Sequence, residues 1–208
     1  LYTLNHVLYG ALNFFNTEVI IKNVFFKKIC SEDVLNIISS KFLIENVNFE
    51  ENCSDGIDID FSEGDITNAK FKHIGNDAID FSGSVAKIDN VVLEDVGDKL
   101  ISIGENSTVH IKNLIGKNSY VGIASKDGST TNLKNIRMDN VKIGLAAYIK
   151  KDEYASAKII AEKIFINNSK AKSLTDKKSK IILNKNKLNV KTDFILPIVY
   201  NKEENLIN

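Results

Sequence analysis

A repeat of about 22 residues governs most of this chain and restricts what it can fold into. The apolar residues at the centres of six short runs are each 22 positions apart: Leu35, Ile57, Ile79, Ile101, Ile123 and Leu145. A second column places asparagine at intervals of 22 or 23: Asn23, Asn46, Asn68, Asn90, Asn113 and Asn135. Regular spacing over this many units is typical of a solenoid, in which each repeat packs only on its neighbours.

The composition of each repeat indicates strands rather than helices. The runs are short, rich in Ile, Val and Phe, and alternate between apolar and polar residues. A coil of this length holds about three strands and three corners, and successive coils lie ~4.8 Å apart, so equivalent side chains stack. Asparagine suits such a corner because it tolerates the left-handed conformation and its amides can hydrogen-bond along a ladder. The sequence predicts an all-β, single-domain parallel β-helix of seven to eight coils.

The regular spacing fails after Asn135. The next comparable motif is AEKIFI at residues 161–166, an interval of 28, so the extra residues around 148–154 are expected to form a loop outside the coil. We expect residues 1–10 to be a partial coil or lead-in, residues 11–190 the β-helix, and residues 191–208, with the only proline, a C-terminal cap or tail. Because the chain begins at Leu1, we also expect it to be part of a longer protein.

Composition excludes several classes of function. The chain has 27 Lys and Arg and 27 Asp and Glu, and Arg137 is its only arginine, so nucleic-acid binding is not expected. No apolar run approaches the ~18 residues of a membrane span. His6, His73 and His110 are scattered, so no metal centre or triad is predicted from them. Cys30 and Cys53 are 23 residues apart and should be neighbours on successive coils, either as buried thiols or as a disulfide.

Acidic residues flank the Leu35 column in the coils that follow it. Two positions before the column stand Asp33, Asp55, Asp77 and Lys99, and one position after it stand Asn36, Asp58, Asp80 and Ser102. Strand alternation directs these side chains outward. Carboxylates ~5 Å apart repel by roughly 1–3 kcal/mol, which a shared proton, a bound cation or sugar hydroxyl groups would relieve. For Asp33, Asp55 and Asp77 the alternative is that they cap corners by accepting backbone N–H groups.

Residues 11–183 resemble the right-handed parallel β-helix of the pectin-lyase-like superfamily, and the acidic motif resembles that of polygalacturonases. The family motif Asn-Thr-Asp-Gly-x-Asp corresponds to CSDGID at residues 53–58, and its paired aspartates correspond to Asn76 and Asp77. The Gly-His-Gly motif corresponds to Gly97-Asp98-Lys99, without the histidine, and Arg-x-Lys to Ala124-Ser125-Lys126, without the arginine. The resemblance implies acid–base chemistry on a polysaccharide and a secreted, periplasmic or cell-surface location.

These observations predict a candidate site on one face. The candidate catalytic residues are Asp55, Asp58, Asp77 and Asp80. The candidate ligand-binding residues are Asp60, Ser102, Lys99, Lys126 and Tyr148. We expect a monomer that binds a polysaccharide or oligosaccharide, with the acidic face acting on uronic-acid-type polymers. A calcium ion bound at that face is the one cofactor that the pattern allows, and no dedicated set of metal ligands is predicted. The alternative is a non-catalytic structural or adhesive segment of a larger surface protein.

Overall fold

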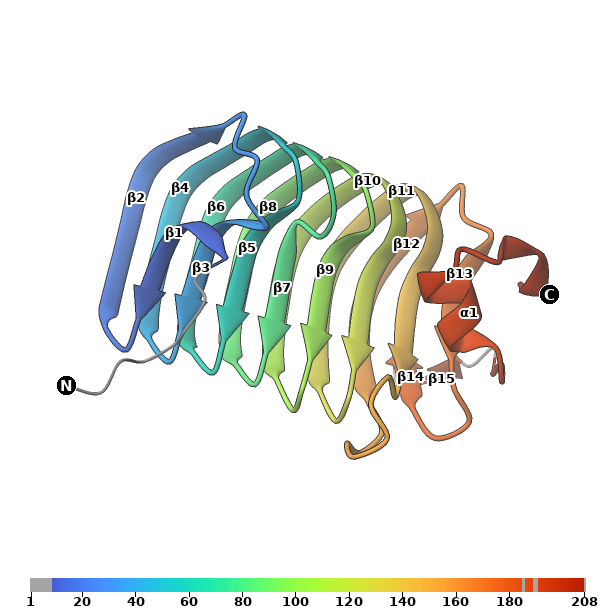
Figure 1. The fold of residues 1–208 in the computed structure, drawn as a ribbon. Helices are drawn as coiled ribbons and strands as arrows, with labels where there is room; N and C mark the ends of the chain where they lie inside the picture. The colour runs from blue at the N-terminus through green and yellow to red at the C-terminus, as the bar shows by residue number, and fades with distance from the viewer. Residues whose placement is uncertain (1–8, 185, 189–190, 208) are drawn as a thin grey trace.

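The chain winds into a parallel β-helix of about eight coils (Figure 1). The structure is a computed structural model that describes residues 9–184, 186–188 and 191–207. Its strands are β1 (Gly10–Phe15), β2 (Glu18–Lys27), β3 (Asp33–Ile38), β4 (Lys41–Asn52), β5 (Asp55–Asp60), β6 (Glu63–Ile74), β7 (Ile79–Ser82), β8 (Val85–Val96), β9 (Lys99–Gly104), β10 (Thr108–Lys126), β11 (Thr130–Tyr148), β12 (Lys158–Asn167), β13 (Ala171–Thr175), β14 (Lys180–Leu183) and β15 (Asn186–Leu188). The helices are α1 (Ile195–Tyr200) and the 3-10 helix η1 (Glu204–Leu206).

Three faces surround the core, and they are named here A, B and C. Face A contains β1, β3, β5, β7, β9, the last parts of β10 and β11, and β13. Face B contains the first parts of β2, β4, β6, β8, β10, β11 and β12, followed by β14. Face C contains the remaining parts of those long strands. The strands pair in parallel throughout these faces, whereas β15 closes on β14 in antiparallel fashion.

The predicted stacking of the Leu35 column is confirmed. Each of its six members is the register partner of the next, from Leu35 to Leu145. All six side chains are at most 2% exposed, so the column forms a continuous wall of the core. The aromatic column stacks in the same way, with ring centroids 4.6 Å apart for Phe26 and Phe49 and 4.7 Å apart for Phe49 and Phe71. These distances match the ~4.8 Å spacing of successive coils.

The asparagine column forms the corner between faces B and C, as predicted. All six asparagines have positive φ, between 53° and 57°. Several of their amides bond along the ladder, with Asn90 Nδ2 donating to Asn68 Oδ1 at 2.6 Å and Asn46 Nδ2 to Asn23 Oδ1 at 3.2 Å. The Asn113 amide donates instead to Asp89 Oδ1, at 2.8 Å. A ladder that the sequence analysis missed lies at the corner between faces A and B. There the backbone N–H of one serine donates to the hydroxyl of the next, from Ser40 through Ser62, Ser84 and Ser107 to Ser129.

The break in the repeat has the predicted form. Leu133 pairs with Ala161, 28 residues later, and residues 149–157 form a loop outside the strands. The C-terminal helix α1 does not continue the coil but packs on the outside of face A (Figure 1). It covers an apolar patch whose members include Val121, Ala124, Ile143, Ala146 and Leu174. Most of the expected N-terminal lead-in, residues 1–8, lies outside the described residues. Neither helix in the described ranges is long and apolar enough to cross a membrane.

The two cysteines form a disulfide across adjacent coils. Cys30 and Cys53 have Cα atoms 4.8 Å apart and are bonded to each other. The interpretation as two buried thiols is therefore wrong on both points, since the two sulfur atoms are bonded to each other and both residues are exposed. They lie beyond the end of face C, where the chain turns toward face A, and the coil spacing alone brings their Cα atoms within bonding range.

Candidate functional site

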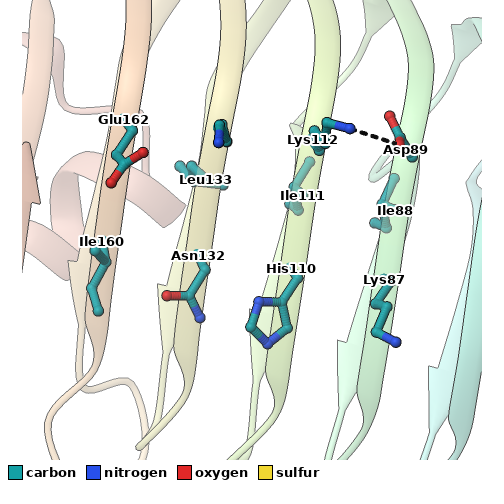
Figure 2. Close-up of a pocket in the computed structure, with 11 residues that line it drawn as sticks. Lys87, Ile88, Asp89, His110, Ile111, Lys112, Asn132, Leu133, Ile160 and Glu162 are labelled. Atoms are coloured by element: carbon teal, nitrogen blue, oxygen red, sulfur yellow. Dashed lines mark ion pairs between the residues drawn. The ribbon is translucent and has the colours of Figure 1, made fainter.

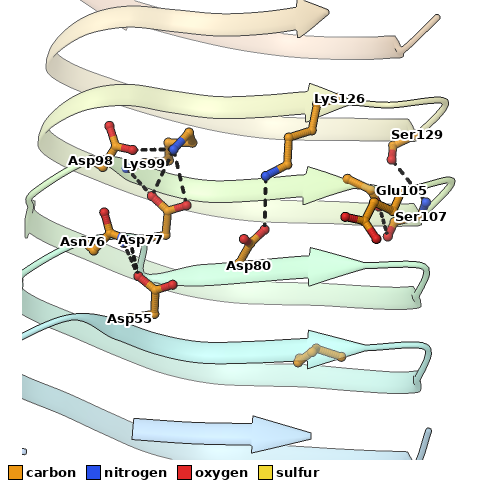
Figure 3. A network of polar contacts seen from close by, with 12 residues as sticks. Asp55, Asn76, Asp77, Asp80, Asp98, Lys99, Glu105, Ser107, Lys126 and Ser129 are labelled. Atoms are coloured by element: carbon orange, nitrogen blue, oxygen red, sulfur yellow. Dashed lines mark hydrogen bonds and ion pairs between the residues drawn. The ribbon is translucent and has the colours of Figure 1, made fainter. Parts of the chain in front are cut away.

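Polar side chains gather on two faces of the solenoid. Face B carries a shallow groove of mixed charge (Figure 2), and face A carries a group of aspartates (Figure 3). On face A, Asn36, Asp58, Asp80 and Ser102 are successive register partners, so they form one outward column. We call the aspartate carboxyl groups of β5 and the β7 coil the acidic face: Asp55, Asp58, Asp60, Asp77 and Asp80. Asp77 is only 4% exposed, so the expectation that its side chain points outward is wrong. The structure thus brings the four candidate catalytic residues and Asp60 together.

Asp55 and Asp77 are bonded to the backbone of the following coil. Asp55 Oδ1 accepts the N–H of Asp77 at 2.8 Å and the amide of Asn76 at 2.6 Å. Asp77 Oδ1 accepts the N–H of Lys99 at 2.9 Å. These are the bonds that the corner-capping interpretation predicts, and they extend from coil to coil. Asp33 differs, because the N–H of Asp55 donates instead to the carbonyl of Glu32 at 3.0 Å.

Asp58, Asp60 and Asp80 have no such backbone bonds among the described residues. Within the described part of the chain, the only hydrogen bond to Asp58 comes from the amide of Asn36, whose Nδ2 lies 3.0 Å from Asp58 Oδ2. Burial, followed by the charges of Asp60 and Asp80, raises the pKa of Asp58 to about 9. Burial and the charge of Asp80 raise the pKa of Asp60 to about 6. Asp58 is therefore a neutral carboxylic acid at pH 7, able to donate one hydrogen bond as well as accept them.

Two lysines, Lys99 and Lys126, border the aspartates on the side of the later coils (Figure 3). Lys99 Nζ lies 3.4 Å from Asp77 Oδ1, also pairs with Asp98, and sits 5.4 Å above the centre of the Tyr200 ring. The Lys99 side chain is only 4% exposed. Burial lowers the pKa of Lys99, but the charges of Asp77 and Asp98 more than offset it, so the net shift is upward. Lys99 is therefore a charged, internally paired group.

Lys126 reaches back over two coils to Asp80. Its Nζ lies 3.8 Å from Asp80 Oδ1 (Figure 3). The intervening coil has Gly104 at the position that Lys126 crosses, and a Cβ there would come within 2.7 Å of Lys126 Cε. The absence of a side chain at Gly104 thus provides the space in which the lysine lies. Both lysines that border the acidic face are therefore already paired with aspartates.

Ser102 and Tyr148, predicted to bind ligand, are not accessible. Both are 0% exposed. Tyr148 lies in the cluster beneath α1 and its hydroxyl is 2.9 Å from that of Tyr200. Ser102 Oγ is buried and has no hydrogen-bond partner among the described residues. Sequence reasoning missed this burial, although the change of the outward column from aspartate to Ala124 and Ala146 was a signal of it. The partly exposed residues of the candidate site are therefore Asp55, Asp58, Asp60 and Asp80. Asp77, Lys99 and Lys126 are at most 8% exposed.

The described residues contain no group of three or more His, Cys, Asp or Glu arranged to hold a metal ion. Calcium favours six to eight oxygen ligands. On the acidic face, Asp55 and Asp77 already accept backbone and side-chain donors, and Asp80 is paired with Lys126. The side chains as they stand therefore offer no ready set of calcium ligands.

Comparison with known proteins establishes the family. The model of the right-handed β-helix region matches residues 34–188, and the chain belongs to this family. The match agrees with the resemblance to the pectin-lyase-like superfamily. No curated protein matches the chain. The narrower resemblance to polygalacturonases depends on Asp55 and Asp77, which are the two aspartates that bond to the backbone of the next coil.

Proposed function

We propose that the acidic face binds a polysaccharide through Asp58, Asp60 and Asp80. The observation that carries this proposal is the partly exposed Asp58, whose pKa of about 9 keeps it protonated at neutral pH. A protonated carboxyl beside an ion-paired one presents a donor and several acceptors within one rung, ~4.8 Å. Sugar hydroxyl groups both donate and accept hydrogen bonds, so they match this arrangement.

The pairing of the lysines favours a neutral sugar on this face over a uronic acid. Lys99 is held by Asp77 and Asp98, and Lys126 by Asp80. A carboxylate on the ligand would therefore meet two lysines that are already paired, and it would be repelled by the aspartates. For the acidic face we therefore propose a neutral polysaccharide in place of the uronic-acid-type polymer expected from the sequence.

The same residues suit bond cleavage as well as binding. Glycoside hydrolysis commonly uses a neutral carboxylic acid as proton donor and a second carboxylate as base or nucleophile. Asp58 has the character of the acid, and Asp80 is its register partner on the next coil. An experiment on this face should therefore measure products as well as affinity.

The test compares two proteins, the wild type and the double variant Asp58→Ala/Asp60→Ala. Each is assayed against a panel of neutral and uronic oligosaccharides. Calorimetry measures binding, and reducing ends and ultraviolet absorbance measure hydrolysis and elimination. We expect a neutral oligosaccharide to bind and the double variant to lose at least about tenfold in affinity, about 1.4 kcal/mol. Glu94→Ala, which removes a carboxylate on face C, should bind as the wild type does. Equal affinity in the acidic-face variant would refute the proposal.

The second candidate function is a structural or adhesive segment without a ligand on this face. The backbone bonds of Asp55 and Asp77 favour it, because they give those two aspartates a purely structural role. In that case Asp58→Ala/Asp60→Ala would change neither binding nor turnover of any sugar. Substitutions at Asp55 or Asp77 would then affect stability and no sugar-dependent property.

A further inference from the structure

A further groove lies where face C meets the asparagine corner, and it crosses β8, β10, β11 and β12. Its volume is about 360 Å³, within the size range of sites for small ligands. Two rows of outward side chains line it. The row on face C is Ile115, Arg137 and Phe165, which are successive register partners. The row at the corner is Asn90, Asn113, Asn135 and Lys163. This groove shares no lining residue with the groove on face B (Figure 2).

The row on face C places a cation between two exposed apolar side chains. Ile115 is 46% exposed and Phe165 is 60% exposed, so both leave much of their apolar surface in contact with water. The Arg137 guanidinium lies 5.9 Å from the centre of the Phe165 ring, which is a cation–π contact. Because successive coils are ~4.8 Å apart, the two apolar side chains stand ~10 Å apart with Arg137 between them. A ligand with an apolar part would therefore gain from covering this row.

The charge of this groove is positive and unbalanced. Its cations are Arg137 and Lys163, and among the described residues that line it there is no aspartate or glutamate. Neither cation has an ion-pair partner in the part of the chain that the structure describes. Lys99 and Lys126, in contrast, are buried and paired with aspartates on face A. An anion that enters the groove therefore meets two unpaired cations and no repelling carboxylate.

We propose that this groove binds a small aromatic carboxylate. The carboxylate of the ligand accepts parallel hydrogen bonds from the Arg137 guanidinium, whose planar fork matches its geometry, and Lys163 supplies a second positive charge. The aromatic ring of the ligand covers the exposed surfaces of Ile115 and Phe165. The groove is on a different face from the acidic face, and the proposal does not depend on the function proposed there.

The lining requires both parts of such a ligand. A hydrophilic acid such as a sugar acid would form the ion pair but would leave Ile115 and Phe165 in contact with water. An exposed ion pair alone contributes little to affinity, because water and salt screen it. An uncharged aromatic compound would cover the apolar row but would leave both cations without an anion. The combination of a ring and a carboxylate is therefore what distinguishes the ligand.

The experiment is a calorimetric titration of the wild type with three probes that separate these parts. Naphthoate carries a ring and a carboxylate, naphthalenemethanol carries the ring alone, and glucuronate carries a carboxylate on a hydrophilic ring. We expect naphthoate to bind at least about tenfold more tightly than either of the others. Arg137→Ala and Phe165→Ala should each lose about tenfold or more in affinity for naphthoate. Both side chains are exposed, so neither substitution removes a part of the core.

Matched controls separate this site from general surface charge and from the acidic face. Lys70→Ala/Lys117→Ala removes two exposed lysines from face C and should bind naphthoate as the wild type does. Asp58→Ala/Asp60→Ala should also leave this binding unchanged. The proposal is overturned if the wild type does not bind naphthoate, or binds naphthalenemethanol or glucuronate equally well. It is also overturned if Arg137→Ala and Phe165→Ala bind naphthoate as the wild type does, or if the lysine variant loses as much affinity as they do.

Discussion

At the scale of single residues, the aspartates of face A divide by what their oxygens contact. Asp55 and Asp77 bond to the backbone of the next coil, whereas Asp58, Asp60 and Asp80 do not. Both groups come from one repeated acidic pattern, yet the first maintains the fold and the second is available to a ligand. Substitutions in the two groups should therefore affect different properties.

Lys99→Met tests the structural group. Because the substitution leaves the buried Asp77 carboxylate without its cation, we expect a loss of about 3 kcal/mol in the free energy of unfolding. Urea denaturation monitored by circular dichroism measures this loss. The double variant Asp77→Asn/Lys99→Met removes both charges and should recover part of the stability. A single variant as stable as the wild type would show that the pair contributes little.

Stability should decrease as pH rises. Burial first, and neighbouring carboxylates second, raise the pKa of Asp60 to about 6, of Asp33 to about 7 and of Asp58 to about 9. The folded state binds these protons more tightly than the unfolded state, whose aspartate pKa is about 4. This contribution is complete below about pH 4 and is lost as pH rises to about 9.

Thermal denaturation across that pH window tests the linkage. The melting temperature of the wild type should fall by several degrees toward the alkaline end. Asp58→Asn, which cannot ionise, should show a smaller fall above about pH 7. If the two proteins have parallel profiles, Asp58 does not have the raised pKa that the proposed function requires.

At the scale of elements, each coil depends on its corners, and face A depends on the helix that covers part of it. The corner between faces B and C uses the left-handed conformation at every asparagine of the ladder. On face A, α1 covers the apolar portion and leaves the acidic portion uncovered. Ile195, Ile198 and Val199 of α1 are almost fully buried against Val121 and Ile143.

Asn68→Ala and Asn68→Gly test the corner. Asn68 has a φ of 53° and accepts a hydrogen bond from Asn90. A left-handed alanine costs about 1–2 kcal/mol, whereas glycine adopts this conformation readily. We expect the alanine variant to be less stable than the glycine variant in chemical denaturation. Equal stabilities would mean that the left-handed conformation does not limit the corner.

Ile198→Ala tests the cover over face A. Ile198 is 0% exposed, and its carbonyl accepts a hydrogen bond from Tyr120 Oη at 2.7 Å. Truncating a buried isoleucine costs about 2–5 kcal/mol. Because α1 is short, we expect it to detach before the coils unfold, with increased binding of an apolar dye and unchanged far-ultraviolet dichroism. If the far-ultraviolet dichroism is instead lost at the point where dye binding changes, α1 and the coils unfold together.

At the scale of the whole molecule, the repeat predicted the fold because equal spacing and period-two alternation leave one consistent register. The Leu35 and asparagine columns were confirmed for this reason. The serine ladder from Ser40 to Ser129 has the same spacing and could have been found in the same way. The position of α1 could not, because no local pattern in residues 195–200 specifies which face they cover. The pairing of Lys126 with Asp80 depends on a side-chain path over Gly104, which alignment of repeats does not show.

The central claim is that Asp58 is a protonated, ligand-accessible carboxyl group on the acidic face. An NMR titration of the aspartate carboxyl carbons, with and without a neutral oligosaccharide, tests it most directly. We predict that the Asp58 signal titrates at about pH 9 and shifts when the sugar is added, while that of Asp95, at a corner beyond face C, does not shift. An Asp58 signal that is already ionised at neutral pH, or that responds to no sugar, would contradict the account.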